Sequence, residues 1–293
     1  MPLFQMLFIS VSKTLYKCTS VNWRDFLNMK LFHRIYGNGP PLIILHGLYG
    51  SSDNWVTIAR ILSDSFTVIL PDQRNHGQSP HSEIHDYNSM RDDLFELVSD
   101  LSIKKFFLAG HSMGGKTAIS FALKWPEMLN GLLIADISPF TTETGRDSAF
   151  SQHSEILRAI LSIDLQKISN REQAEKLLSE RISSAKVRGL ILKNLQRVSA
   201  NSFAWKLNPQ SLMKNLDKIT EGVERSHSFN QQITGFPVIF LKGSESDYIP
   251  KEDFNDIMKV FPAAEIIEIP GAGHWIQADK PEEVVKYLRK LLQ

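Results

Sequence analysis

The residues whose types and spacing could do covalent chemistry begin with a serine between two glycines. Gly110-His111-Ser112-Met113-Gly114 has the pattern G-x-S-x-G, and it lies between an apolar run at 106–109 and helix-forming residues at 116–124. In a strand, turn and helix of this kind, the turn exposes the serine hydroxyl beside the helix N-terminus. The sequence therefore predicts that Ser112 is a nucleophile, which needs a base to accept its proton.

His274 is the candidate for that base. It lies in Gly271-Ala272-Gly273-His274-Trp275, directly after an apolar segment at 265–269 that we expect to be the last strand. The glycines before the histidine suit a loop that brings an imidazole to the site. His274 would accept the proton of Ser112 and later give it to the leaving group.

Two acids compete for the third role, which is to orient the imidazole and stabilise its charged form. Asp136 ends one predicted apolar strand, and Asp247 follows another. The acid of such a fold commonly stands three residues after the glycine that ends the later strand. Counted from Gly243, that position is Ser246, so we favour Asp136 and keep Asp247 as the alternative acid. Either acid gives the chain order serine, acid, histidine.

Backbone groups that could hold an oxyanion are predicted from a second glycine motif. The apolar run at 42–45 is typical of a buried strand, and His46-Gly47-Leu48-Tyr49-Gly50 follows it. In hydrolases of this layout the loop donates one N–H to an oxyanion hole, and the residue after the nucleophile donates another. We therefore expect the N–H groups of Leu48 and Met113 to be these donors. Such a reaction needs no metal and no organic cofactor.

Strand-like and helix-like segments alternate along most of the chain. Apolar runs and amphipathic helices alternate over 29–138, and the pattern returns over 236–293. This alternation predicts an α/β fold with a mostly parallel, doubly wound sheet. Residues 139–235 have helical patterns and no strong strand, so we expect a helical cap inserted over the sheet. Phe140 and Trp205 could line an acyl pocket beneath that cap, or only hold the cap together.

The composition bounds the partners and the sites that the chain can have. It has 33 basic and 32 acidic residues and a net charge of +1, so bulk charge gives no reason to expect nucleic acid as a partner. The single cysteine, Cys18, cannot form a disulfide framework or a zinc site. We expect no transmembrane segment, and a small-molecule acyl ester or thioester as the partner. The oligomeric state is not predicted.

Residues 1–28 form an N-terminal extension of different composition. The segment from Met1 to Arg24 has no acidic residue, and it carries Lys13 and Lys17 among apolar and hydroxyl residues. This composition resembles that of a mitochondrial transit peptide. We therefore expect a mitochondrial protein, with a plain extension on a cytoplasmic protein as the alternative.

Four segments, in this order, resemble one group of proteins. They are Asp72-Gln73-Arg74-Asn75-His76-Gly77, the segment from Gly110 to Ala118, Asp136-Ile137-Ser138-Pro139, and the loop from Gly271 to Trp275. From about Met29 to its end, the chain is similar to the α/β-hydrolase superfamily. The four segments more narrowly resemble mitochondrial and bacterial esterases related to abhydrolase domain-containing protein 11, a group that includes the yeast ethanol acetyltransferases.

The resemblance implies a triad of Ser112, Asp136 and His274, and esterase or thioesterase activity, sometimes with acyl transfer to an alcohol. The expected function is a serine hydrolase that cleaves carboxylic esters or thioesters through an acyl-enzyme on Ser112. The alternatives are an alcohol acyltransferase with the same acyl-enzyme and a non-catalytic binding protein that retains the fold. Epoxide hydrolases and haloalkane dehalogenases share the fold, but they need an aspartate where Ser112 stands.

Overall fold

A computed structural model gives the structure of the chain and describes residues 29–199, 202–223 and 232–293. The predicted targeting segment, residues 1–28, lies outside the described residues. None of the helices in the described part is both long and apolar enough to cross a membrane.

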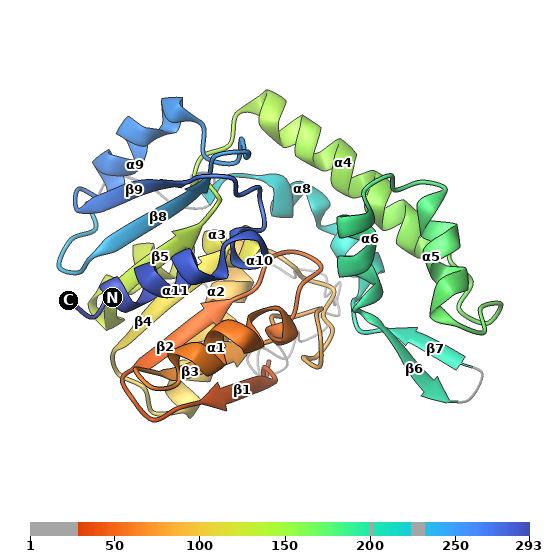
Figure 1. Cartoon of the computed structure of the whole chain (residues 1–293), viewed down its shortest axis with the longest axis horizontal. Helices are drawn as coiled ribbons and strands as arrows, with labels where there is room; N and C mark the ends of the chain where they lie inside the picture. The colour runs from red at the N-terminus through yellow and green to blue at the C-terminus, as the bar shows by residue number, and fades with distance from the viewer. Residues whose placement is uncertain (1–28, 200–201, 224–231) are drawn as a thin grey trace, which may run out of the picture.

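A seven-stranded sheet runs through the centre of the fold, in the order β1-β3-β2-β4-β5-β8-β9 (Figure 1). Its strands are β1 (His33–Tyr36), β2 (Pro41–Leu45), β3 (Thr67–Pro71), β4 (Phe106–His111), β5 (Leu129–Ala135), β8 (Val238–Gly243) and β9 (Ala264–Ile269). Only the edge pair β1–β3 is antiparallel, and every other pair is parallel. The predicted α/β class and mostly parallel sheet are therefore confirmed.

Helices cover both faces of the sheet, which explains why its central strands are apolar throughout. The side chains of Ile43 and Leu45 belong to the hydrophobic cluster on one face, which also contains residues of α2 (Tyr87–Asp100), α3 (Met113–Lys124) and α9 (Phe254–Val260). Their neighbours Leu42 and Ile44 point to the opposite face, where α1 (Val56–Leu62), α10 (Ile276–Asp279) and α11 (Pro281–Lys290) cover them. Because the strands are parallel, their carboxyl ends meet at one edge of the sheet, where open α/β sheets bind their ligands.

The segment between β5 and β8 forms the expected cap beside that edge (Figure 1). Its helices are α4 (Glu143–Leu161), α5 (Arg171–Ser179), α6 (Ala185–Leu192), α7 (Pro209–Lys214) and α8 (Leu216–Thr220). They enclose a hydrophobic cluster of their own, built on residues such as Leu157, Leu178 and Leu212. The cap therefore packs as a small unit in addition to covering the sheet.

The cap is not purely helical, which corrects the sequence-based expectation. An antiparallel hairpin of β6 (Leu195–Ser199) and β7 (Ser202–Trp205) follows α6. The sequence favoured helices throughout 139–235, but α6 ends at Leu192 and Asn194 makes a turn there. The strands pair with each other along their length, and that tertiary pairing overrides a weak helical pattern.

The two ends of the cap are joined to each other and to the helix that follows Ser112. The N–H of Val223 donates to the carbonyl of Pro139 at 2.8 Å, which closes the insertion. Lys116 lies on α3 with only 4% of its surface exposed. Its Nζ donates to the carbonyl of Glu221 at 2.5 Å and to the hydroxyl of Thr141 at 3.3 Å, so one buried ammonium contacts both ends of the cap.

Replacing Lys116 with methionine, which keeps much of the length and removes the charge, is expected to loosen the cap. A hydrogen bond from a charged group contributes about 1.5–3 kcal/mol, and the variant loses both bonds. Amide hydrogen exchange should become faster in α4 and α8 and stay unchanged in α2. The matched control is Lys124→Met at the exposed end of the same helix. Unchanged exchange in α4 and α8 of the Lys116 variant would contradict this role.

Candidate active site

Ser112 occupies a strained turn between β4 and α3. Its φ of 52° and ψ of −119° lie outside the regions that non-glycine residues normally adopt. The flanking glycines make the turn possible, because a Cβ on Gly110 would lie 2.2 Å from the carbonyl oxygen of Gly114. A Cβ on Gly114 would lie 2.5 Å from the carbonyl oxygen of His46. The strand, turn and helix predicted around Ser112 are therefore present.

Asp136 directly follows β5 and is completely buried. Its Oδ1 accepts the N–H of Gly243 at 2.8 Å, and its Oδ2 accepts the hydroxyl of Ser246 and lies 2.8 Å from Nδ1 of His274. A carboxylate only accepts hydrogen bonds, so Nδ1 of His274 carries the proton. This tautomer leaves Nε2 as the nitrogen that can accept a proton from another group.

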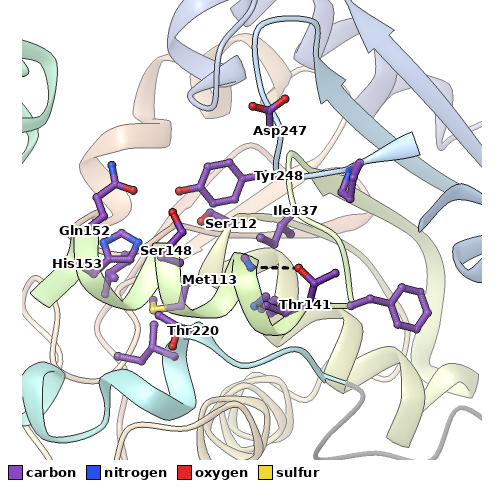
Figure 2. Close-up of a pocket in the computed structure, with 18 of the residues that line it drawn as sticks. Ser112, Met113, Ile137, Thr141, Ser148, Gln152, His153, Thr220, Asp247 and Tyr248 are labelled. Carbon is purple, nitrogen blue, oxygen red and sulfur yellow. Dashed lines mark hydrogen bonds between the residues drawn. The ribbon is translucent and has the colours of Figure 1, made fainter. Parts of the chain in front are cut away.

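Asp247, the alternative acid, does not take this position. Its side chain is exposed on the rim of the cavity. Figure 2 shows its carboxylate beyond the ring of Tyr248, pointing away from Ser112. The carboxylate that contacts His274 belongs to Asp136, so the alternative assignment was wrong.

Two aromatic side chains fix His274 in addition to Asp136. The ring of Tyr248 stacks on the imidazole, with ring centroids 3.8 Å apart and planes 19° from parallel. The ring of His111 also lies near the imidazole, with ring centroids 4.7 Å apart, and its Nε2 is 2.8 Å from the carbonyl oxygen of His274. Burial lowers the pKa of His111 well below its usual value, so His111 stays neutral and donates from Nε2. The imidazole and its backbone are therefore both held.

The predicted oxyanion donors lie beside Ser112. Leu48, Ser112 and Met113 line the same cavity. Met113 is the first residue of α3, so its N–H has no acceptor within the helix. The turn that contains Leu48 is closed by a 3.0 Å hydrogen bond from the N–H of Gly50 to the carbonyl of Gly47. Both backbone groups are thus positioned at the edge of the sheet where the side chain of Ser112 lies.

Buried histidines accept hydrogen bonds from backbone N–H groups in and beside the turn that contains Leu48. Nε2 of His46 accepts the N–H of Gln73 at 2.9 Å, and Nε2 of His76 accepts the N–H of Tyr49 at 3.3 Å. His85 lies beside His76, with ring centroids 5.7 Å apart. Burial lowers the pKa of all three, and that of His85 falls to about 3. They therefore act as neutral structural groups.

The cavity at Ser112 has a volume of about 300 Å³ and lies between α3 and the inner face of α4 (Figure 2). Its lining combines apolar and polar side chains, among them Ile137, Phe140, Thr141, Gln152, His153 and Thr220. Phe140 thus lies where the sequence led us to expect it. Trp205 does not line the cavity, because it lies on β7 and packs against the cap's own hydrophobic cluster. Of the two roles expected for Trp205, the structure therefore shows the one of holding the cap together and not the pocket role.

Three residues that contact the site received no such role from the sequence. Ser246 stood in the position counted for an acid, and the hydroxyl there instead donates to Asp136. Tyr248 acts through packing, and His111 through a backbone contact from a position of the G-x-S-x-G motif that accepts any residue, so neither role has a sequence signal of its own. The offset from Gly243 was the one available signal, and it indicated Ser246.

Comparisons with known proteins agree with this fold. The family described as alpha/beta hydrolase fold matches residues 40–281. The chain is 36% identical over 260 residues to a protein of Danio rerio named sn-1-specific diacylglycerol lipase ABHD11, covering 88% of this chain and 80% of that protein. It is 31% identical over 259 residues to the probable alcohol acetyltransferase of Saccharomyces cerevisiae, covering 83% of this chain and 74% of that protein.

A solved structure is similar over nearly the whole chain. A marine microorganism esterase is 39% identical, with a TM-score of 0.85, and the match covers 90% of this chain and 100% of that one. The resemblance read from four short motifs is therefore confirmed by similarity over most of the sequence and by the fold.

Acid is expected to destabilise the protein through the buried histidines. Below the usual histidine pKa of 6.5 the unfolded chain binds protons that the folded chain does not, so stability falls as the pH falls. Each such histidine costs up to about 1.4 kcal/mol of unfolding free energy per pH unit until its folded pKa is reached. In urea titrations between pH 6.5 and 4, His85→Asn should therefore show a shallower decline than the unaltered protein. Equal declines would contradict the assignment of His85 as a buried neutral group.

Proposed function

The chain belongs to the alpha/beta hydrolase fold family, and we propose that it is a serine esterase that cleaves carboxylic esters through an acyl-enzyme on Ser112. The observation that carries the proposal is the contact between His274 and the buried Asp136 at the edge of the sheet where the strained Ser112 turn lies. These are the groups that nucleophilic catalysis by a serine requires.

The first half of the proposed reaction makes the acyl-enzyme. Nε2 of His274 accepts the proton of the Ser112 hydroxyl as its oxygen attacks the ester carbonyl. The carbonyl oxygen becomes an oxyanion, and the N–H groups of Leu48 and Met113 donate to it. One such donor contributes about 3 kcal/mol to transition-state stabilisation in other hydrolases. The imidazolium then gives its proton to the leaving alcohol, and the acyl group remains on Ser112.

The second half returns the enzyme to its starting state. Water attacks the acyl carbonyl while His274 accepts one of its protons, and the same two N–H groups again hold the oxyanion. Collapse of this intermediate expels the oxygen of Ser112, which takes the proton back from the imidazolium. Asp136 stays ionised and stabilises the positive imidazolium in both halves. The products are a carboxylic acid and the alcohol.

The cavity supports a small or single-chain acyl group. A volume of about 300 Å³ is at the low end of ligand sites, which range over roughly 300–1,000 Å³. The names of the relatives indicate esters of alcohols: one is called a diacylglycerol lipase and another a probable alcohol acetyltransferase. A thioester would react through the same steps with a thiolate as leaving group.

Acyl transfer to an alcohol is the second candidate, and the similarity to the yeast acetyltransferase favours it. The two reactions share the acyl-enzyme and differ only in whether water or an alcohol attacks it. Turnover of a p-nitrophenyl ester with and without ethanol separates them. An ethyl ester among the products would identify transfer, and free acid alone would identify hydrolysis.

A fluorophosphonate probe tests the proposal, because it reacts with serines that are activated by a base. The native protein should be labelled and should hydrolyse p-nitrophenyl esters, while Ser112→Ala should lose the label and at least about 10³-fold in kcat. Ser148→Ala, which alters another serine of the same cavity, is the control and should keep the label. A native protein without label or turnover would contradict the proposal and favour a binding protein.

Ser246 should affect the rate of catalysis through its hydrogen bond to Asp136, without contacting the substrate. In Ser246→Ala the carboxylate loses one donor, so it attracts the imidazolium more strongly and is less firmly oriented. We expect kcat to fall about 10-fold at constant KM across the pH profile, because the imidazole is less firmly oriented. The matched control is Ser244→Ala in the same loop, whose Oγ accepts the N–H of Gly271. Equal profiles for the two variants would contradict this role.

A further inference from the structure

The hydrophobic cluster of the cap contains residues that belong to the catalytic loops. Tyr49 is buried in this cluster, and Leu48 and Trp275 pack against it. Leu48 and Tyr49 lie in the turn that follows β2, and Trp275 follows His274 in the chain. The cap therefore contacts both loops through its own hydrophobic cluster, in addition to lining the cavity with side chains of α4.

Asn194 makes a polar contact from the cap to the first loop. It follows α6 with 2% of its surface exposed, and its Nδ2 donates to the carbonyl of Tyr49 at 2.8 Å. The cap fixes Asn194 itself, since its N–H donates to Ile191 and its carbonyl accepts the N–H of Lys206 at 2.8 Å. The amide that reaches Tyr49 is thus held by its own backbone.

Tyr49 adopts a conformation that needs such support. Its φ of 63° is in the left-handed region, which is unfavourable for a tyrosine. Its N–H donates to His76 of the core, while its hydroxyl lies 3.2 Å from Nδ1 of His153 on α4 of the cap. Since Tyr49 directly follows Leu48, a relaxation of its backbone would move the N–H that faces the oxyanion.

Lys186 lies on α6 and contacts the second loop, which carries His274. Its Nζ lies 2.6 Å from Oδ1 of Asp279, and the other oxygen of that carboxylate accepts the N–H of Gly273 at 3.1 Å. The same ammonium lies 5.0 Å above the ring of Trp275. Both neighbours of His274 in the chain are therefore linked to α6.

We propose that the segment from α6 to Asn194, residues 185–194, positions both catalytic loops. Asn194 is the positioning residue for the turn that carries Leu48, and Lys186 for the loop that carries His274. The inference rests on the proposed serine-esterase function. It adds that the cap is needed for turnover of substrates too small to be recognised by it, such as p-nitrophenyl acetate.

Paired variants separate positioning from general attachment of the cap. Asn194→Ala removes the bond to Tyr49, and Asn215→Ala removes a similar buried bond, from the cap to the carbonyl of Glu83 at 2.9 Å. With p-nitrophenyl acetate, Asn194→Ala should lower kcat about 10- to 100-fold with KM changed less than about 2-fold, because a displaced donor weakens only transition-state binding. Asn215→Ala should change kcat less than about 3-fold.

A second pair tests the histidine loop in the same way. Lys186→Met removes the ion pair with Asp279, and Lys214→Met removes an exposed ion pair between the cap and Glu83 at 2.9 Å. The ion pair of Lys186 is half exposed, so its loss should lower kcat only about 3- to 5-fold. Lys214→Met should leave kcat unchanged.

Hydrogen exchange gives a readout that does not depend on activity. Amides 47–50 should exchange faster in Asn194→Ala than in Asn215→Ala, even if no ester is turned over and the proposed function fails. If Asn194→Ala does not fold, Asn194→Leu, which keeps a side chain of similar size and shape without a donor or a charge, is measured in its place. Equal exchange at 47–50, or equal loss of kcat in the two asparagine variants, would overturn the inference.

Discussion

The buried carboxylate of Asp136 is the interaction on which the rest of the site depends. A charged group with no exposed surface is stable only when donors surround it, and here the donors come from three different segments. Gly243 donates from the end of β8, Ser246 from the loop after it, and His274 from the loop after β9. Satisfying the carboxylate therefore also brings these loops together, so stability and alignment of the imidazole have the same cause.

Backbone strain is concentrated at the same edge of the sheet. Among the described residues, the non-glycine residues with positive φ include Tyr49, Asn75, Ser112 and Asp136, which follow β2, β3, β4 and β5. Each such conformation costs about 1–3 kcal/mol and persists only where the surroundings fix it. The sheet supplies this fixation at Ser112 and Asp136, whose N–H groups donate to the carbonyls of Ala135 and Leu241. The cap contributes to it at Tyr49 and Asn75, through Asn194 and Asn208. This division explains why an insertion far from the nucleophile in sequence contacts the loops beside it.

Much of the fold and part of the site could be predicted from local patterns. The apolar strands and the glycines around Ser112 carry strong signals because sterics allow few alternatives there. The choice between Asp136 and Asp247 stayed open because strand pairing decides which acid faces the imidazole. The pairing of β5 with β8 joins residues that are 106 positions apart, such as Leu132 and Val238. The hairpin was missed, and the role of Trp205 stayed open, because the cap's own packing determines both.

The most direct test of the central claim is the rate at which diethyl p-nitrophenyl phosphate inactivates two asparagine variants. The reagent phosphorylates an activated serine and needs no acyl pocket, so the rate reports the alignment of Ser112 and His274. We predict that Asp136→Asn slows inactivation by about 10³- to 10⁴-fold, because the imidazole then loses its oriented tautomer. Asp247→Asn should stay within about 2-fold of the unaltered protein. Inactivation of Asp136→Asn as fast as that of the unaltered protein would contradict the account. So would an inactivation of Asp247→Asn that is as slow as that of Asp136→Asn.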